Sequence, residues 1–278
     1  MDYFLNAPLI DLEKTLLCGQ AFRWKKIDEG LYEGVAHNHY LKLSQAEDGA
    51  VLHNICEKDI PFWENYFDLQ TDYKKVLEQL SQDSIMREAI INHGGIRLLR
   101  QEPFETLISF IISQNNNIKR ISGIVERLCD EFGEDVVSDE GVYKAFPTAE
   151  VLASLEEPML SPIRAGFRNR YIIDGARKVY YGDVKLYDLY NLSYDGAKAE
   201  LLKITGVGNK VADCVLLFGF YKMESFPEDV WIKRVLSEFY PKGIPLCFKG
   251  YEGIAQQILF DYIRNNSERT EKYAKSNQ

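Results

Sequence analysis

The sequence predicts an α+β fold, with a small N-terminal antiparallel β-sheet domain followed by a mainly helical body. Two observations lead to this prediction. From Gln20 to about Ile55, short runs of alternating apolar and polar residues are separated by Asp, Asn and Gly turns, as in an antiparallel meander. After about residue 60, apolar residues recur at spacings of three and four, which is typical of helices. We place the domain boundary at residue 85, which gives a sheet domain over 1–85 and a helical domain over 86–278.

The predicted strands and helices follow from the same two periodicities. Turn-forming residues at 28–30, 37–39 and 47–49 divide the first part into strands over 20–27, 31–37, 40–45 and 50–55. Helical spacing of apolar residues predicts helices over 73–82, 104–114 and 118–132, and similar patterns recur toward the C-terminus.

Composition limits the class of protein. The chain has 278 residues, of which 46% are hydrophobic, so a sizeable core is expected. No run of 18 apolar residues predicts a membrane span, and the N-terminus lacks the basic region of a signal peptide. Five widely spaced cysteines without a CxxC pair argue against a zinc site or a disulfide framework. We therefore expect a cytoplasmic, nucleoid-associated protein in a prokaryote or a nuclear protein in a eukaryote.

The charge of the chain is unevenly distributed. The formal net charge of −9 and the pI of about 5.1 argue mildly against nucleic acid as a partner. Residues 161–212, however, contain nine Lys and Arg against five Asp and Glu, a local net charge of +4. This stretch fits either a basic binding face on an acidic body or an ordinary solvated surface of mixed charge.

The most specific motif is "LLKITGVGNKVADCVLLFGF", residues 201–220. It predicts one helix that ends at Ile204, a tight turn, and a second helix from about Asn209 to Phe220, within a helix-hairpin-helix unit over about 196–220. Glycines at Gly206 and Gly208 would leave backbone N–H groups and a helix N-terminus open to a phosphate of DNA. The third glycine of a dinucleotide-binding motif is missing, so the alternative is a plain turn between two helices.

Several separate segments, in the same order along the chain, resemble the 8-oxoguanine DNA glycosylases of the helix-hairpin-helix superfamily. They are "CGQAFRW" (18–24), residues 96–133, "TGVGNKVADC" (205–214), "FPEDVWIKR" (226–234) and "AQQILF" (255–260). The resemblance runs from about residue 15 to residue 262. It implies a two-lobed helical body and a monomer that excises 8-oxoguanine from double-stranded DNA in base excision repair, with both glycosylase and AP lyase activity.

The resemblance places the catalytic groups at Lys210 and Asp229. Lys210 falls in the first turn of the second hairpin helix, where the helix dipole and partial burial both favour the neutral, nucleophilic amine. By position alone it could equally be a surface lysine that binds phosphate. Asp229 follows Pro227 and is a good helix N-cap, and such a cap would also hold a carboxylate rigidly toward the sugar. The family assigns Lys210 as nucleophile at C1′ and Asp229 as its electrostatic and acid–base partner.

The resemblance also implies a pocket for an extruded base. Cys214 lies one helical turn after Lys210, and Cys214 and Phe260 are expected to sandwich the base. Gln256 would bind its Watson–Crick edge, and the carbonyl of Gly19 would accept the N7–H of oxidised guanine. Without the resemblance, Cys214 and Phe260 would be assigned to core packing and Gln256 to a surface amide.

The segment "SQNNNIKR" (113–120) is expected to hold the DNA from which the base has left. By resemblance, Asn115 fills the vacated space, Arg120 and Arg168 read the opposite cytosine, and Phe167 opens the base stack. Without the resemblance, consecutive asparagines between two helical patterns indicate a turn.

No cofactor and no catalytic metal is expected, although backbone carbonyls near Gly206 and Gly208 are candidates for holding a structural cation. Two positions depart from the family pattern. Glu228 adds a negative charge beside Asp229, which is expected to weaken DNA binding, and Trp231 replaces a phosphate-binding histidine.

Three other functions stay open. A monofunctional glycosylase for alkylated bases would usually lack a lysine at position 210. A non-enzymatic helix-hairpin-helix DNA-binding protein would need neither Asp229 nor Gln256. An acidic scaffold protein would have no affinity for DNA. DNA binding that falls steeply as the salt concentration rises would therefore reject this alternative.

Overall fold

The N-terminal part of the chain is a five-stranded antiparallel sheet, as the alternating pattern predicts. The structure is a computed structural model and describes residues 1–265. The strands run in the order β1-β5-β4-β3-β2, and neighbours pair antiparallel throughout. Their bounds are β1 Tyr3–Asn6, β2 Trp24–Asp28, β3 Leu31–Ala36, β4 His39–Ala46 and β5 Gly49–His53. Strand β1, which the sequence did not predict, pairs with β5 at the sheet edge.

Two helices, α1 (Leu12–Leu17) and α2 (Ile60–Tyr66), complete the core of the sheet domain. Fully buried Leu41, Leu43 and Leu52 from β4 and β5 pack with Trp63 of α2, which is 1% exposed. Apolar burial of this kind is the main stabilising contribution to a small domain. The sheet therefore has a core of its own, separate from that of the helical body.

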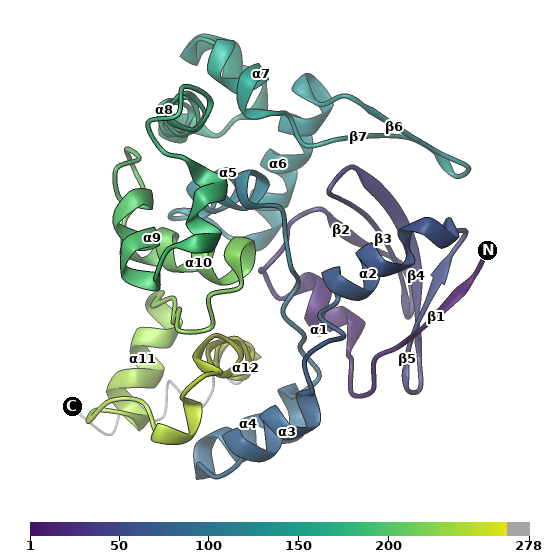
Figure 1. The fold of residues 1–278 in the computed structure, drawn as a ribbon, viewed down its shortest axis with the longest axis vertical. Coiled ribbons are helices and arrows are strands. Elements are labelled where there is room, and N and C mark those ends of the chain that lie inside the picture. Colours follow the sequence, from purple (N-terminus) through teal and green to yellow (C-terminus); the bar gives the residue numbers. More distant parts are fainter. Residues whose placement is uncertain (266–278) are drawn as a thin grey trace.

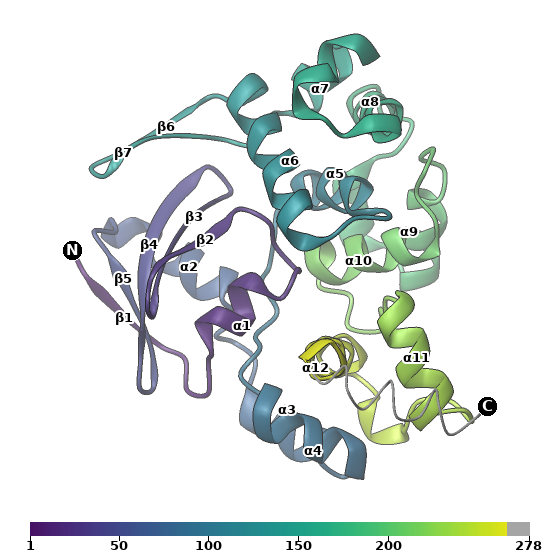
Figure 2. The same ribbon diagram turned by 180° about the vertical axis from the view of Figure 1, so that it is seen from behind.

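The rest of the chain is mainly helical, and its helices pack in two groups (Figures 1 and 2). One group contains α5 Pro103–Ser113, α6 Ile118–Phe132, α7 Ala149–Ser154, α8 Asn169–Tyr180, α9 Tyr194–Leu201 and α10 Asn209–Phe220. The other contains α3 Tyr73–Leu80, α4 Ser84–His93, α11 Val230–Phe239 and α12 Glu252–Asn265. This confirms the predicted fold class, including the two lobes. Helix α3 lies before the predicted boundary at residue 85 but packs into the core of the helical body.

Short elements link the long helices. A hairpin of β6 (Asp135–Ser138) and β7 (Gly141–Lys144), which was not predicted, follows α6. Among the described residues, 3₁₀ segments occur at η1 Glu57–Asp59, η2 Glu157–Ile163, η3 Gly166–Arg168, η4 Leu186–Asn191 and η5 Leu246–Phe248. Across residues 1–265, no helix combines the length and apolar character that a membrane span requires.

The helical hairpin is formed by α9 and α10, and α10 begins and ends where the sequence predicts. From Val211 to Phe220 every residue of α10 is buried, so only its N-terminal turn reaches the surface. Buried Asp213 accepts a hydrogen bond from the Tyr194 hydroxyl at 2.6 Å and lies 2.8 Å from the Lys198 ammonium. Both partners lie on α9, so this carboxylate fixes the two hairpin helices against each other.

The C-terminal end of α10 is tied to the sheet domain through Asp68, which is fully buried and has a left-handed backbone (φ 54°). Its carboxylate accepts hydrogen bonds from Arg100 at 2.8 Å and from the hydroxyls of Thr71 and Tyr73 at 3.1 Å each. It also accepts from the hydroxyl of Tyr221, the residue that ends α10. A buried carboxylate is tolerated only when paired in this way, so the group acts as one unit.

We therefore predict that Asp68→Asn destabilises the protein by roughly 3 kcal/mol, because the Arg100 guanidinium loses its buried counterion. Urea unfolding followed by circular dichroism would measure this change. The control is Asp139→Asn, at an exposed carboxylate in the β6–β7 turn. If the two variants unfold at the same urea concentration, the Asp68 carboxylate does not stabilise the protein as proposed.

Candidate active site

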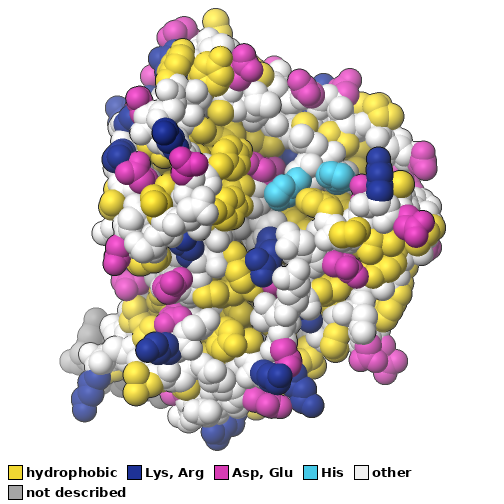
Figure 3. All heavy atoms as spheres, in the orientation of Figure 1, with side chains coloured by type: hydrophobic (Ala, Val, Ile, Leu, Met, Phe, Trp, Pro, Cys, Tyr) yellow, Lys and Arg dark blue, Asp and Glu magenta, His cyan; other side chains and the backbone are white. Residues whose placement is uncertain are grey.

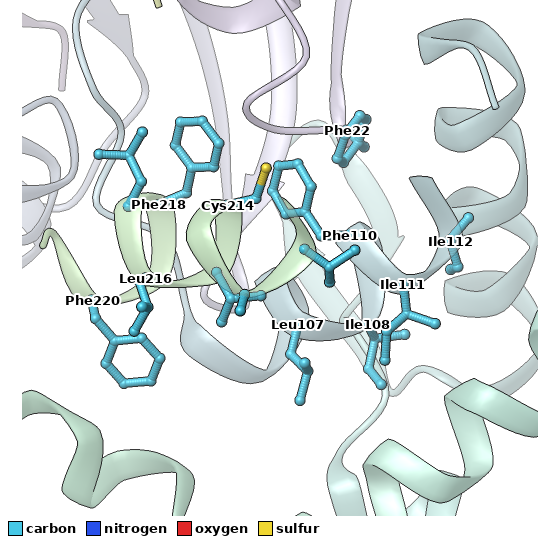
Figure 4. Close-up of a cluster of buried hydrophobic side chains, with 14 of the residues drawn as sticks. Phe22, Leu107, Ile108, Phe110, Ile111, Ile112, Cys214, Leu216, Phe218 and Phe220 are labelled. Atoms are coloured by element: carbon cyan, nitrogen blue, oxygen red, sulfur yellow. The ribbon is translucent and has the colours of Figure 1, made fainter. Parts of the chain in front are cut away.

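The N-terminal turn of α10 places Lys210 at the edge of a cavity. Lys210 is half-buried, and its Nζ lies 5.1 Å from the centre of the Phe110 ring on α5. One turn further on, Cys214 lies on the same side of the helix, with Phe110 and Phe218 near it (Figure 4). Burial raises the pKa of the Cys214 thiol to about 11, although its hydrogen bond and proximity to Lys210 act in the opposite direction. The thiol is therefore neutral, an apolar wall beside the amine.

Asp229 is the N-cap of α11, as the sequence suggested. Its Oδ1 accepts hydrogen bonds from the backbone N–H groups of Trp231 at 3.0 Å and Ile232 at 2.8 Å. No hydrogen bond within residues 1–265 reaches its second oxygen, so one carboxylate oxygen anchors the side chain while the other stays available. The neighbouring Glu228 is exposed.

The predicted catalytic and base-pocket residues line one cavity. It encloses about 340 Å³ of empty space, part of it open to solvent. Its lining comprises Gly19, Phe110, Lys210, Cys214, Phe218, Pro227, Asp229, Gln256, Gln257 and Phe260. Six of these ten are the residues that the sequence assigned to catalysis and base binding, although their roles stay predictions.

Sequence reasoning missed the other four lining residues. Phe110 and Phe218 fit the apolar pattern of their helices, and their rings stack at 5.3 Å, so nothing in the spacing separates them from core residues. Pro227 was read only as a neighbour of Asp229. The signal for Gln257 was present, because two adjacent amides interrupt the apolar pattern of "AQQILF".

Gly19 contributes to the cavity from the sheet domain, in the loop that follows α1. Its φ of +103° belongs to the left-handed region, and a Cβ at this position would lie 2.8 Å from the side chain of Ile118. The neighbouring Gln20 is fully buried and donates to the carbonyls of Thr15 and Arg97, at 2.8 Å each. These bonds fix the loop, and the carbonyl of Gly19 accepts no hydrogen bond from the residues that the structure describes.

The three asparagines of "SQNNNIKR" have three different environments in the turn between α5 and α6. Asn116 donates its amide to the carbonyl of Ile112 at 3.3 Å, at the end of α5. Asn117 is the N-cap of α6 and accepts from the N–H of Arg120 at 3.0 Å. Asn115 is exposed in left-handed backbone (φ 47°), and its side chain makes no hydrogen bond within the described part of the chain. Asn115 is thus the one of the three that is free to bind a ligand.

Arg168 holds this turn in place. The side chain is 3% exposed and donates to the carbonyls of Gln114 at 2.9 Å, Asn115 at 3.1 Å and Ala165 at 3.0 Å. Burial lowers the pKa of the Arg168 guanidinium, and the nearby charge of Arg120 lowers it further. Two cations therefore lie close together beside Asn115.

Phe167 stands beside this pair. It is 49% exposed, with the Arg168 guanidinium 4.5 Å from its ring centre. The structure thus places Asn115, Arg120, Phe167 and Arg168 together, and their predicted contacts with DNA stay predictions. In this structure Arg168 is occupied with backbone carbonyls, so it supports the turn as well.

The two hairpin glycines differ in their surroundings. Gly206 has φ +85°, and a Cβ at this position would lie 2.5 Å from the ring of Tyr171. Gly208 is the N-cap of α10 in extended backbone, with nothing within 4 Å of a Cβ. Gly206 is therefore required by the turn, whereas Gly208 leaves the helix N-terminus uncovered.

The predicted structural cation near these glycines stays a prediction. The Lys178 ammonium donates to the carbonyl of Lys203 at 2.5 Å and lies 3.1 Å from Asp174. Asp174 in turn accepts from the N–H of Thr205 at 2.7 Å. This end of the turn thus already holds a positive charge, and a second cation would have to share its carbonyls with an ammonium group.

A larger cavity, with about 790 Å³ of empty space, lies between β2–β4, α6 and β7. Its charged lining includes the ion pair of Lys25 with Glu126, and none of the predicted site residues lines it. We assign the active site to the smaller cavity because an amine, a capped carboxylate and two buried amides converge there.

Comparison with known proteins supports the family resemblance. Residues 3–107 match the model of the 8-oxoguanine DNA glycosylase N-terminal domain, and residues 108–243 match the HhH-GPD superfamily of base excision DNA repair proteins. An N-glycosylase/DNA lyase of Saccharomyces cerevisiae is 32% identical over 262 residues, which cover 85% of this chain and 70% of the yeast protein.

Two solved structures have the same fold. The structure of MBOgg1 with a low-affinity DNA ligand has a TM-score of 0.88 at 38% identity and covers 93% of each chain. The 8-oxoguanine glycosylase/lyase of Clostridium acetobutylicum, in complex with DNA containing cytosine opposite 8-oxoguanine, has a TM-score of 0.88 at 34% identity. That comparison covers 94% of this chain and 93% of the other.

The fold, the hairpin and the cavity thus define a helix-hairpin-helix DNA glycosylase of base excision repair. Within this superfamily, the chain belongs to the 8-oxoguanine DNA glycosylase family.

The hairpin geometry predicts that substitution of its two glycines by alanine lowers the free energy of unfolding by different amounts. Gly206→Ala should lower the free energy of unfolding by roughly 1–3 kcal/mol, because alanine is strained at positive φ and its Cβ would meet the Tyr171 ring. Gly208→Ala should cost less, roughly 0.5 kcal/mol, because the site is uncrowded and in extended backbone and only the N-cap preference for glycine over alanine is lost. Thermal unfolding of both variants measures the difference, and equal losses would contradict the assignment of Gly206 as the residue that the turn requires.

Proposed function

We propose that this protein is a bifunctional DNA glycosylase and AP lyase that excises 8-oxoguanine from double-stranded DNA in base excision repair. The observation that carries the proposal is the convergence of Lys210 and the capped Asp229 on one cavity with Cys214, Gln256 and Phe260. An amine beside a carboxylate, in a pocket lined with apolar and amide groups, suits attack on a sugar whose base has been extruded.

Lys210 would act as the nucleophile. Its neutral amine attacks C1′ of the deoxyribose, the bond from C1′ to the base nitrogen breaks, and its electron pair leaves with the base, which gains a proton. Loss of the ring-oxygen bond then gives a Schiff base between Lys210 and C1′. Removal of a C2′ proton expels the 3′ phosphate by β-elimination, which nicks the strand.

Asp229 would stabilise the positive charge that develops on the sugar as the base leaves. Its Oδ1 is fixed by two backbone N–H groups of α11, so the free oxygen needs little reorganisation during the reaction. Asp229 would also transfer protons between Lys210, the base and the sugar.

The other predicted residues would bind the rest of the damaged DNA. Cys214 and Phe260 would sandwich the base, Gln256 would bind its Watson–Crick edge, and the Gly19 carbonyl would accept N7–H, which guanine lacks. Asn115, Phe167, Arg120 and Arg168 would occupy the vacated position and bind the opposite cytosine. Gly206 and Gly208 would present the hairpin to a phosphate.

The proposal has consequences for where and how the protein works. Because its substrate is DNA, we infer that it acts in the cytoplasm of a prokaryote, on the nucleoid, or in the nucleus of a eukaryote. All proposed site residues lie on one chain, so a monomer suffices, and no step of the proposed reaction needs a cofactor.

We predict that Lys210→Gln abolishes both borohydride trapping and nicking of a duplex that carries one 8-oxoguanine opposite cytosine. The amide cannot form a Schiff base, so the loss should exceed roughly 1,000-fold. Gel electrophoresis of end-labelled DNA measures both activities. The control is Lys75→Gln, at a lysine that is 79% exposed on α3.

Two of the alternative functions predict different results when the wild-type protein is given duplexes that carry either 8-oxoguanine or an alkylated base. Release of an alkylated base without any covalent adduct would indicate a monofunctional glycosylase. Tight binding to DNA without nicking, unaffected by Asp229→Asn, would indicate a non-enzymatic DNA-binding protein. Either result would overturn the proposal.

A second prediction concerns the opposite base. Arg120→Ala should reduce the preference for cytosine over adenine opposite the lesion by roughly 10-fold, because one cationic contact to that base is lost. Single-turnover excision rates on the two duplexes measure the preference. The control is Arg87→Ala on α4, and an unchanged preference in Arg120→Ala would remove Arg120 from the site.

A further inference from the structure

Gln257 is a buried amide in the active-site cavity to which the proposed function gives no role. Its side chain is 5% exposed, and it lines the same cavity as Lys210 and Phe260. A role in packing alone does not explain a buried amide, because each of its polar atoms that stays without a hydrogen bond lowers the stability of the protein.

Gln257 belongs to a chain of hydrogen bonds that crosses the cavity wall. The Cys18 thiol lies 3.7 Å from Oε1 of Gln257, and Nε2 of Gln257 donates to Oε1 of Gln256 at 2.6 Å. Nε2 of Gln256 then donates to the carbonyl of Pro227 at 3.0 Å, two residues before Asp229. These hydrogen bonds thus join the loop after α1, through α12, to the segment that carries Asp229. Figure 2 shows where α1, α12 and α11 lie.

The Pro227 end of this chain fixes the orientation of the two amides. The carbonyl of Pro227 can only accept, so the NH₂ group of Gln256 must face it and its oxygen must face the other way. Burial raises the pKa of the Cys18 thiol to about 12, so it keeps its proton, and it has two acceptors nearby, the oxygen of Gln257 at 3.7 Å and the carbonyl of Thr15 at 3.8 Å. The NH₂ group of Gln257 therefore lies beside the oxygen of Gln256.

This arrangement places an acceptor and a donor side by side at the cavity wall. The oxygen of Gln256 has a second lone pair, and the NH₂ group of Gln257 has a second hydrogen that is not donated to any of residues 1–265. The Watson–Crick edge of guanine carries the complementary pattern, with O6 as acceptor beside N1–H and the N2 amine as donors.

We propose that Gln257 is a specificity-determining residue that donates a hydrogen bond to O6 of the extruded base, while the remaining lone pair of the Gln256 oxygen accepts from N1–H. This inference rests on the proposed function, because it assigns the substrate contact of a second residue in the same cavity. Together the two amides would select an oxidised base that has a carbonyl at position 6. They would disfavour one with an amine there, whose hydrogens would face those of Gln257.

The test compares three duplex substrates under single-turnover conditions, with the full-length protein. The first carries 8-oxoguanine, the second 2-amino-8-oxopurine, which lacks both O6 and the hydrogen on N1, and the third an abasic site, which has no base. Gln257→Met keeps the volume and removes the donor. It should slow excision of 8-oxoguanine by roughly 10-fold, and leave the rates on the other two substrates unchanged.

A second variant and a control sharpen the result. Gln257→Glu should slow 8-oxoguanine excision more than Gln257→Met, because a carboxylate would face two acceptors, O6 and the oxygen of Gln256. The matched control is Gln79→Met, at a glutamine on α3 that donates to the carbonyls of Cys247 and Lys249. That variant should behave as wild type on all three substrates.

The outcomes separate this inference from the proposed function. If the wild-type protein nicks neither 8-oxoguanine nor abasic DNA, the proposed function fails and this inference with it. If the wild type is active and Gln257→Met retains its full rate on 8-oxoguanine, only the role of Gln257 fails. Equal slowing on all three substrates would also overturn it, because that result indicates a purely structural role.

Discussion

The active site depends on how α10 is held against the sheet domain. Lys210 stands at the one open end of an otherwise buried helix, whereas Gly19 enters the same cavity from the sheet domain. Lys210 and Gly19 keep their relative position only if the core of the helical body stays fixed against the core of the sheet domain. Asp68 provides that connection, because its buried carboxylate binds Arg100 and the hydroxyl of Tyr221 at the far end of α10. Rigid support of this kind is what preorganised catalytic groups require.

Much of the fold could be predicted from the sequence, because the relevant signals are local. Alternation and turn residues identified the meander, and the glycine-rich turn located α10 from Asn209 to Phe220. Strand β1 and the β6–β7 hairpin were missed, since each strand has only four residues and is too short to show a periodicity. Pairing of β1 with β5 joins segments about 50 residues apart, and no local pattern encodes that contact.

The site was predicted by two different kinds of reasoning. Spacing alone put Lys210 and Cys214 on one face of a helix, and Asp229 at an N-cap. Only the family resemblance joined them to Gly19 and Gln256, which are far away in sequence. Neither kind of reasoning found that Arg168 is buried against backbone carbonyls or that Gln257 is bonded to Gln256. Those facts depend on side-chain orientation, which follows from tertiary packing and cannot be read from residue type.

The distribution of surface charge bears on how an acidic protein can bind DNA. On the face in Figure 3, Lys and Arg are interspersed with Asp and Glu, and hydrophobic side chains lie around the centre together with histidine and basic side chains. Overall attraction to phosphate is therefore modest at a net charge of −9, and local cations must supply the binding. Arg168 is buried, and its guanidinium donates to the carbonyls of Gln114, Asn115 and Ala165. The hydrogen bonds of Arg168 to these carbonyls explain its placement by the needs of the fold, whereas the exposed Arg120 beside the exposed Asn115 is left open to a ligand.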